Sequence, residues 1–295
     1  MKTNYTALVL MVAAAGLAGT AAQAQDKVKI GYISDMSSLY ADLEGKHGAT
    51  AIQMAIDDFG GKVLGMPIEL MSADHQNKAD IAASKAREWI DTQGLTMLFG
   101  GTQSGTALAM AEIAKEKKRV FFDSGAGSSA LTNDQCSPYT VHYAYDTVAL
   151  AKGTGSAVVK QGGKSWFFLT ADYAFGHSLE KDAADVVKAN GGEVLGAVRH
   201  PFPGSDFSSF LLKAQSSGAQ IIGLANAGGD TINSIKQAAE FGVTPKQSLA
   251  GLLMFITDVH SLGLKVTQNM YLTEGFYWNL NDETRAWSKR FFDAH

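Results

Sequence analysis

Residues 95–117 read LTMLFGGTQSGTALAMAEIAKEK, and this stretch decides the fold class of the chain. The run 95–100 is short and apolar, which predicts a strand buried on both faces of a sheet. Glycines and small polar residues follow at 101–105, and apolar residues then recur at helical spacing over 106–117. A buried strand, a tight turn and a helix form the repeating step of a parallel α/β sheet.

The same step recurs on both sides of this stretch. We expect further strands at 27–33, 67–72, 119–123, 165–170, 193–198, 219–225 and 247–253. We expect further helices at 48–59, 80–91, 149–161, 176–190, 207–216, 231–241 and 281–295. These elements fall into two blocks, 25–145 and 146–271, and the segment 272–295 returns to the first block. The sequence therefore predicts an α/β protein of two lobes, each a parallel sheet with helices on both faces.

The first residues have the anatomy of a secretory signal. Lys2 is followed by an apolar run over 7–22, and the small residues of Ala22-Gln23-Ala24 close the segment. A transmembrane anchor is the weaker reading, because the run is rich in Ala and Gly and falls short of the ~20 apolar residues that a span needs. We expect residues 1–24 to be a signal peptide and the exported chain to begin near Gln25.

Composition narrows the function classes further. A net charge of −4 argues against nucleic-acid binding, which favours basic patches. With 46% hydrophobic and 18% charged residues, the chain has the composition of a globular protein. Its single cysteine, Cys136, is interpreted as a small buried hydrophobic residue, and a partner beyond the end of this sequence is the alternative.

The sequence ends at His295, directly after a predicted helix that carries Trp287, Phe291 and Phe292 on its apolar side. We interpret the chain as C-terminally truncated, with the remainder of the fold missing after 295. The alternative is a short natural variant that ends in a docked helix.

Signatures of enzymes and cofactors are weak. Gly163-Lys164-Ser165 resembles the end of a phosphate-binding loop, but a strand rather than a helix is expected after it. The run GTQSG at 101–105 misses the nucleophile-elbow spacing by one place, and the histidines are scattered. We therefore predict a chain without catalytic residues, cofactor or metal, and keep an amidase or hydrolase on the same scaffold as an alternative.

Two loops of small residues lie where ligands bind in α/β sheets, beyond the carboxyl ends of strands. Ser104, Gly105 and Thr106 follow the strand at 95–100, and the Ser104 hydroxyl with the amides of a helix start suits a carboxylate. A helix cap with nothing bound is an equally good explanation of this loop taken alone. The second loop offers Gly125, Ala126 and Ser128, and two adjacent loops of this kind favour a shared anion pocket.

Residues from other loops could form the wall of such a pocket. Tyr40 follows the first strand, and Tyr173 and Phe175 follow the strand at 165–170, although packing at a sheet edge explains these aromatics as well. Asn226 lies in a later loop of the same kind. Asp230 is interpreted as a helix N-cap more readily than as a ligand contact.

Six segments together resemble the type I periplasmic solute-binding proteins of the leucine/isoleucine/valine-binding family. These segments are KIGYISDMSSLYADLEG at 29–45, GGTQSGTALA at 100–109, VFFDSGAGSSALT at 120–132, ADYAFGHSLE at 171–180, SDFSSFLLKAQSSGAQIIGLANAGGD at 205–230 and IKQAAEFGV at 235–243. The resemblance implies a periplasmic, monomeric hinge protein that captures a small carboxylate ligand. It also implies delivery of that ligand to an ABC permease in the inner membrane. A sensory protein that presents its ligand to a membrane receptor is the alternative.

The resemblance also implies roles for residues. The loops of Ser104 and of Gly125–Ser128 would grip the α-carboxylate, and Phe175 would close over it from the second lobe. Members that bind amino acids carry an acidic residue after the strand that ends near Gly251, whereas residues 251–255 here are wholly apolar. Either Asp230 or Glu274 substitutes, or the ligand has no ammonium group.

This departure favours a carboxylate with an apolar or aromatic tail, and a branched-chain or other amino acid is the alternative. The expected wall of the tail pocket is aromatic throughout. It comprises Tyr40, Tyr173, Phe175, Phe255 and Trp278.

Overall fold

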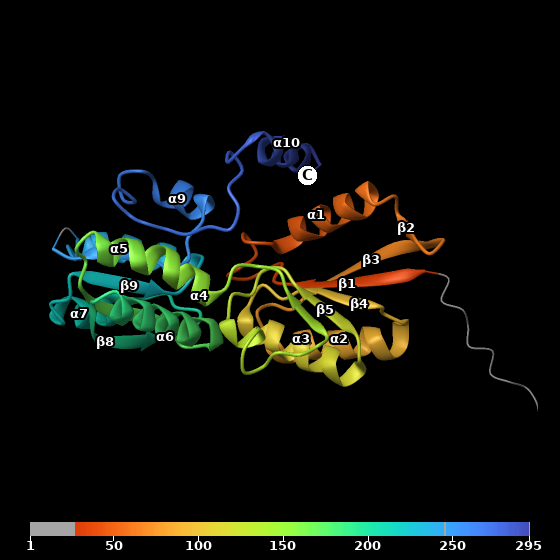
Figure 1. Cartoon of the computed structure of the whole chain (residues 1–295), viewed down its shortest axis with the longest axis horizontal. Helices are drawn as coiled ribbons and strands as arrows, with labels where there is room; N and C mark the ends of the chain where they lie inside the picture. Colours follow the sequence, from red (N-terminus) through yellow and green to blue (C-terminus); the bar gives the residue numbers. More distant parts are fainter. Residues whose placement is uncertain (1–26, 245, 295) are drawn as a thin grey trace, which may run out of the picture.

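The computed structural model describes residues 27–244 and 246–294, which form two lobes side by side (Figure 1). The predicted signal peptide and the expected start near Gln25 lie outside these described residues. Each lobe is built around its own sheet, as the alternation of buried strands and amphipathic helices predicts.

The N-terminal lobe contains a sheet with the strand order β2-β3-β1-β4-β5-β6. Its strands are β1 (Val28–Ser34), β2 (Lys62–Val63), β3 (Met66–Asp74), β4 (Met97–Gly100), β5 (Val120–Asp123) and β6 (Thr140–His142). All neighbours pair in parallel except β2, which runs antiparallel to β3. The carboxyl ends of the parallel strands therefore share one edge, and the predicted ligand loops begin there.

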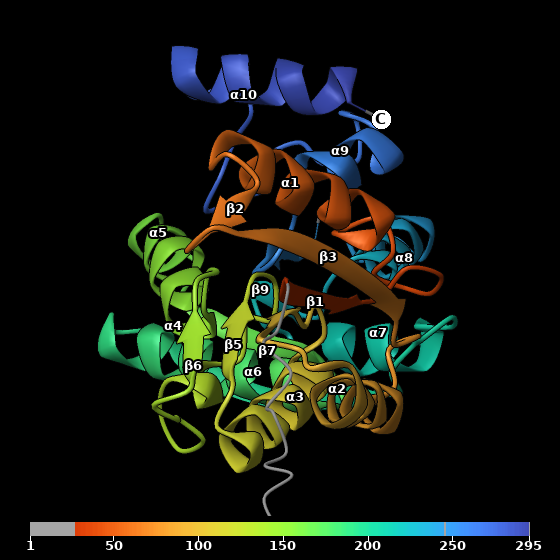
Figure 2. The same ribbon diagram turned by 90° about the vertical axis from the view of Figure 1, so that its right-hand side faces the viewer.

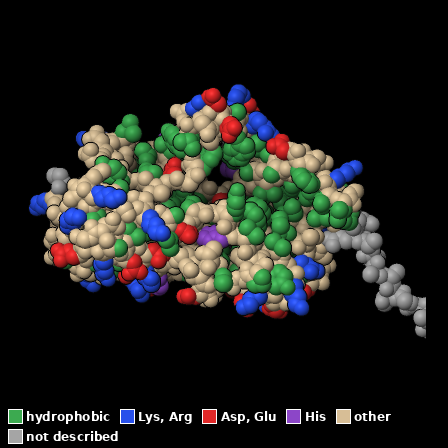
Figure 3. Space-filling view, viewed as in Figure 1, with side chains coloured by type: hydrophobic (Ala, Val, Ile, Leu, Met, Phe, Trp, Pro, Cys, Tyr) green, Lys and Arg blue, Asp and Glu red, His purple; other side chains and the backbone are tan. Residues whose placement is uncertain are grey.

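Helices cover both faces of this sheet. Helix α1 (Gly45–Asp58) packs on one face over Tyr32, while α2 (Ala79–Gln93) and α3 (Ser104–Lys117) pack together on the other. The short helix η1 (Ser129–Leu131) follows β5. Strands β5 and β6 leave the apolar side chains of Val120 and Val141 exposed, and Figure 3 shows hydrophobic side chains gathered on this lobe.

The C-terminal lobe contains a parallel sheet with the order β10-β9-β7-β8. Its strands are β7 (Ser165–Ala171), β8 (Glu193–His200), β9 (Ile221–Ala225) and β10 (Ser248–Gly251). Its helices are α4 (Thr147–Leu150), η2 (Ala151–Gly155), α5 (Ser156–Lys160), α6 (Ala174–Ala189), α7 (Ser208–Ser216), α8 (Gly229–Glu240) and α9 (Ile256–Leu262). Alternate residues of β7 enter two separate cores, one that includes residues of α5 and α6 and one that includes residues of α7 and α8. This is the burial expected of a strand covered on both faces.

The chain passes between the lobes after β6 and again after α9. The second passage leads to helix α10 (Asp282–Asp293), which lies beside α1 of the N-terminal lobe (Figure 2). Arg290 of α10 forms an ion pair of 2.7 Å with Asp58 at the end of α1. None of the residues of α10 is buried. Within the described part of the chain, no helix combines the length and apolarity that crossing a membrane requires.

Three features differ from the expectations. Cys136 is exposed rather than buried, because it lies in the loop that precedes β6. The single helix expected at 149–161 is divided by a π-helical turn at Ala151–Gly155, against which Thr273 of the second passage packs. Strands β2 and β6 and helix α9 were not expected, because each is too short to produce a periodic pattern.

Candidate functional site

A small cavity lies between the lobes, at the carboxyl edges of both sheets. Eleven residues line it: Tyr40, Leu43, Thr102, Ser104, Gly125, Gly127, Tyr145, Tyr173, Phe175, Ala227 and Leu253. Its volume is about 10 Å³, which is close to the space of one water molecule. Pockets that hold small molecules are typically ~300–1,000 Å³, so the cavity in this structure is too small for such a ligand.

The N-terminal side of the cavity is formed by the turns after β4 and β5. Ser104 is the first residue of α3, and the cap of this helix is Gln103, whose Oε1 accepts a hydrogen bond of 2.7 Å from the Thr106 amide. The Ser104 hydroxyl is therefore not used as the cap. It instead accepts a hydrogen bond of 3.1 Å from the Ser128 amide and joins the two turns.

Glu44 occupies the inner part of these turns and was not among the predicted site residues. Its Oε2 accepts hydrogen bonds from Ser34 at 3.0 Å and Thr102 at 2.6 Å, and its Oε1 accepts one of 2.9 Å from Ser124. A Cβ on Gly125 would lie 2.3 Å from Glu44 Oε1, so a side chain at that position would displace the Glu44 carboxylate. No periodicity points to Glu44, which immediately precedes α1 but makes no side-chain cap there.

Below the second turn lies a buried carboxyl group, that of Asp123. Its Oδ1 accepts a hydrogen bond of 3.3 Å from the Ala126 amide and so fixes the shape of the turn. Burial and the neighbouring Glu44 raise the pKa of Asp123 well above its ordinary value. The neutral form of this carboxyl group is therefore favoured.

The C-terminal side of the cavity is aromatic. Tyr173 shares a hydrogen bond of 2.6 Å with the hydroxyl of Tyr40 from the other lobe, and its ring stacks on Phe202 at a centroid distance of 4.1 Å. Phe175 lies against Gly127, where an added Cβ would be 2.9 Å from the ring. Burial raises the pKa values of Tyr40 and Tyr173, so both hydroxyls stay protonated at neutral pH.

Polar contacts close the gap between the lobes beside the cavity. The hydroxyls of Ser128 and Ser178 are 2.8 Å apart, and Ser129 donates a hydrogen bond of 2.9 Å to Asp182 of α6. Asp182 also accepts a hydrogen bond of 2.6 Å from Thr147 at the start of α4. These contacts tie η1 to α6, next to the passage between the lobes.

Asp230 is fully buried near the tyrosine pair and lies in the first turn of α8, behind the N-cap Gly228. The expectation that it caps the helix is wrong, because its Oδ1 accepts a hydrogen bond of 3.0 Å from the Gly204 amide. Its Oδ2 has no hydrogen-bond partner among the described residues. Burial raises the pKa of Asp230 to about 7, and its charge in turn raises the pKa values of Tyr40 and Tyr173.

The residues predicted as ligand contacts fall into two groups. Ser104, Gly125, Tyr40, Tyr173 and Phe175 line the cavity. The others do not line it and lie in or behind the turns; these are Gly105, Thr106, Ala126, Ser128, Asn226 and Asp230.

Hydrogen bonds explain why some of the second group are turned away from the cavity. Thr106 donates its hydroxyl to the carbonyl of Gln103, and Asn226 accepts a hydrogen bond of 2.7 Å from Thr231. The structure adds Leu43, Thr102, Gly127, Tyr145, Ala227 and Leu253 to the lining. The role of each residue as a ligand contact stays a prediction.

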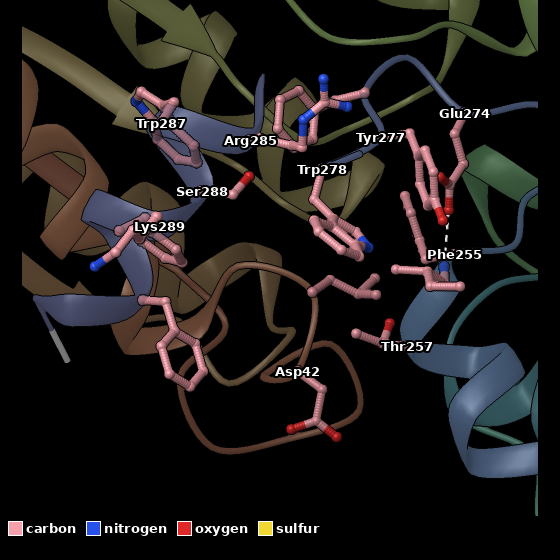
Figure 4. A pocket seen from close by; sticks show the side chains of 15 residues that line it. Asp42, Phe255, Thr257, Glu274, Tyr277, Trp278, Arg285, Trp287, Ser288 and Lys289 are labelled. Atoms are coloured by element: carbon pink, nitrogen blue, oxygen red, sulfur yellow. Dashed lines mark hydrogen bonds between the residues drawn. The ribbon is translucent and has the colours of Figure 1, made fainter. Parts of the chain in front are cut away.

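Two other expected wall residues, Phe255 and Trp278, line a wider groove of about 780 Å³ beside α10 (Figure 4). Glu274 lies in the same groove, and its Oε1 accepts a hydrogen bond of 2.8 Å from the Ile256 amide, the dashed line in Figure 4. Burial raises the pKa of Glu274. Across the described residues, no three histidine, cysteine or acidic side chains gather as a metal site would require.

Comparisons with known proteins agree with this architecture. A family model described as "Periplasmic binding protein" matches residues 27–295. A Leu/Ile/Val-binding protein homolog 6 of Brucella melitensis is 29% identical over 245 residues, which cover 82% of this chain. The chain spans about 60% of the length of that curated relative.

Two crystal structures of bacterial binding proteins are also similar. A periplasmic binding protein from Burkholderia mallei is 68% identical with a TM-score of 0.90, and the match covers 91% of this chain and 72% of that one. The periplasmic ligand-binding protein of a branched-chain amino acid ABC transporter from Burkholderia xenovorans is 41% identical with a TM-score of 0.77. That match covers 90% of this chain and 72% of the other.

Proposed function

Because the chain belongs to the periplasmic binding protein family, we propose that it captures a small carboxylate by hinge closure and delivers it to an ABC importer. The cavity carries this proposal, because residues of both lobes line it at the carboxyl edges of the two sheets. Closure of the lobes around a ligand creates a shape that a permease can distinguish from the open form. The family is one of periplasmic solute-binding proteins rather than enzymes, so we propose binding without turnover.

The carboxylate is proposed to bind to the turns of the N-terminal lobe. Ser104 lies at the start of α3, where backbone amides and the helix dipole favour a negative group. Its hydroxyl accepts a hydrogen bond from Ser128 and so keeps its own proton available for a ligand oxygen. This part of the site is rigid, because Asp123 and Gln103 hold the two turns.

An amino acid is the ligand class that we favour, and Asp230 is the reason. Asp230 does not line the closed cavity, but its buried Oδ2 lacks a hydrogen-bond partner, which is costly. The ammonium group of an amino acid that reached this oxygen would supply the missing donor. In the apolar run at 251–255, Leu252 and Met254 are buried in the hydrophobic cores and Leu253 lines the cavity. This run supplies no acidic partner for an ammonium group, so Asp230 would take that role. The similar protein from B. xenovorans is named for branched-chain amino acids.

An aromatic or keto acid is the second candidate. The rings of Tyr40, Tyr173 and Phe175 surround the cavity and would accept a flat apolar tail. In that case Asp230 would stay protonated, which its raised pKa allows near neutral pH.

The pH dependence of affinity distinguishes these candidates. With Asp230 titrating at about 7, an ammonium ligand such as leucine is expected to bind more tightly at pH 8 than at pH 5.5. Benzoate and 4-methyl-2-oxopentanoate, which lack the ammonium group, are expected to lose affinity over the same range. Calorimetry with the wild type and Asp230→Asn measures both trends, and the variant should abolish the rise for leucine.

A result in which leucine fails to bind while an aromatic or keto acid binds would replace the first candidate by the second. Failure of all three ligands would refute carboxylate capture. Delivery is tested separately, by ligand uptake into proteoliposomes that contain the permease and its ATPase. A protein that binds its ligand but supports no uptake, and instead activates a membrane receptor, would favour the sensory alternative.

A further inference from the structure

The carboxylate of Glu44 lies among hydroxyl groups that would otherwise suit an anionic ligand. Ser34 ends β1, and Thr102 and Ser124 follow the neighbouring strands β4 and β5. All three hydroxyls donate to Glu44 at 2.6–3.0 Å. Thr102 also lines the cavity between the lobes. Glu44 therefore accepts hydrogen bonds from hydroxyl groups that could otherwise bind an anionic ligand at the carboxyl edge of the N-terminal sheet.

The fit around Glu44 is tight. Gly125 separates the carboxylate from the cavity, and an added Cβ there would overlap Glu44 Oε1. At the N-terminus of α1, Glu44 makes no capping hydrogen bond, so its position follows from the three hydroxyls rather than from the helix. The buried Asp123 lies close enough for the charge of Glu44 to affect it.

The cavity offers no other partner for a second negative charge. Among the described residues that line it there is no lysine, arginine or histidine. A ligand's first carboxylate would use Ser104 and the backbone amides of the turns. Glu44 does not line the cavity itself, but it contacts the lining residues Thr102 and Gly125. A second carboxylate would therefore lie either against aromatic rings or close to the negative charge of Glu44, and both surroundings are unfavourable for a desolvated anion.

We infer that Glu44 is a specificity-determining residue that restricts the cleft to ligands with one carboxylate and excludes dicarboxylates. This inference rests on the proposed capture of a carboxylate between the lobes. It narrows the ligand class to molecules such as neutral amino acids or monocarboxylic aromatic acids. Acidic amino acids and dicarboxylic acids of the same shape are rejected by charge rather than by size.

Isosteric ligand pairs test the inference, because their members differ in charge but hardly in shape. Glutamine and glutamate serve for amino acids, and 4-carbamoylbenzoate and terephthalate serve for aromatic acids. By calorimetry at pH 7.5, the wild type should prefer the neutral-tailed member of the bound pair by at least about 100-fold. Glu44→Gln, which keeps the shape and removes the charge, should reduce this preference by at least about 10-fold.

Asp42→Asn is the matched control, since Asp42 is an exposed acidic residue two positions away. It should change the preference by less than about 2-fold if the contact rather than the general charge matters. Equal binding of both members by the wild type, or an unchanged preference in Glu44→Gln, would overturn the inference.

If only leucine or benzoate binds to the wild type, Glu44→Gln should gain measurable binding of glutamate or terephthalate. Absence of that gain also overturns the inference. A wild type that binds none of these carboxylates refutes the proposed function itself, which is a different outcome.

Discussion

The two sides of the cleft are built from different chemistry. The N-terminal side consists of hydroxyls, glycines and backbone amides held by Gln103 and Asp123, whereas the C-terminal side consists of aromatic rings over the buried Asp230. Polar turns fixed by internal hydrogen bonds provide a rigid receptor for an anion, and rings provide an apolar surface that excludes water. The difference suggests that one lobe recognises the charged group and the other recognises the remainder of the ligand.

Blocking the contact between the two sides should have the largest effect. Gly127 lies under Phe175, and Gly127→Val would place methyl groups within the space of the ring. The lobes could then not close fully, and we expect ligand affinity to fall by more than about 100-fold as measured by calorimetry. Gly275→Val is the control, because nothing lies within 4 Å of a Cβ at that position. Unchanged affinity in Gly127→Val would show that ligand binding does not require full closure of the lobes.

Removing the carboxyl group of Asp230, which is buried on the aromatic side of the cleft, should raise the stability of the folded chain at high pH. The pKa of Asp230 is about 7 in the folded chain, above its ordinary value of 3.8, so its contribution to stability is present below about pH 4. That contribution is lost as the pH rises through 7. We expect Asp230→Asn to be more stable than the wild type at pH 8, by up to about 4 kcal/mol, with a smaller difference at pH 5. Calorimetric melting without ligand measures this, and a difference independent of pH would contradict it.

Weakening the polar side should reduce affinity without unfolding the lobe. Ser104→Ala removes a hydroxyl that faces the cavity, and the loss of a hydrogen bond to a carboxylate predicts about 10- to 100-fold weaker binding. Ser137→Ala, in a loop before β6, should bind normally. Circular dichroism checks the fold of both variants. Unchanged affinity in Ser104→Ala would remove this residue from the site.

Loosening the contact between the tyrosines should have the smallest effect of the series. Tyr173→Phe removes the hydrogen bond to Tyr40 but keeps the ring and its stacking on Phe202. A net loss of ~0.5–1.5 kcal/mol from the closed form predicts about 2- to 10-fold weaker binding. Tyr271→Phe, at an exposed position, is the control for loss of a phenol hydroxyl. If Tyr173→Phe changed the association rate of the ligand more than its dissociation rate, the hydrogen bond to Tyr40 would not be what stabilises the closed form.

The sequence predicted the layers of the fold because buried strands and amphipathic helices leave periodic patterns. The run at 95–117 forms β4 and α3, whose ends agree with the expected ones and whose starts differ by two residues. Ser104, expected in the loop, is the first residue of α3 and lies at the expected sheet edge. Tyr40, Tyr173 and Phe175 were expected as wall residues because they follow predicted strands, and Phe175 also because of the family resemblance. All three line the cavity, and their role as ligand contacts stays a prediction.

The missed residues share a physical reason. Glu44, Tyr145 and Leu253 reach the cleft or its base from irregular segments, where side-chain direction follows no period. The role of Gln103 as helix cap was missed because serine is the more common cap, and the adjacent Ser104 suggested itself. Contacts between lobes, such as Tyr40 with Tyr173, join positions 133 residues apart, and local sequence patterns do not encode such pairs.

The exposed thiol of Cys136 can be labelled with a chemical probe. It is the one cysteine of the sequence. Asp185 and, to a smaller extent, Asp134, which precedes Cys136 by two residues, raise the pKa of Lys181 in α6. A fluorophore attached to this thiol would therefore lie on one lobe and beside the other. Its emission should change when the lobes separate, so the natural chain carries a ready attachment point for an optical sensor of its own ligand.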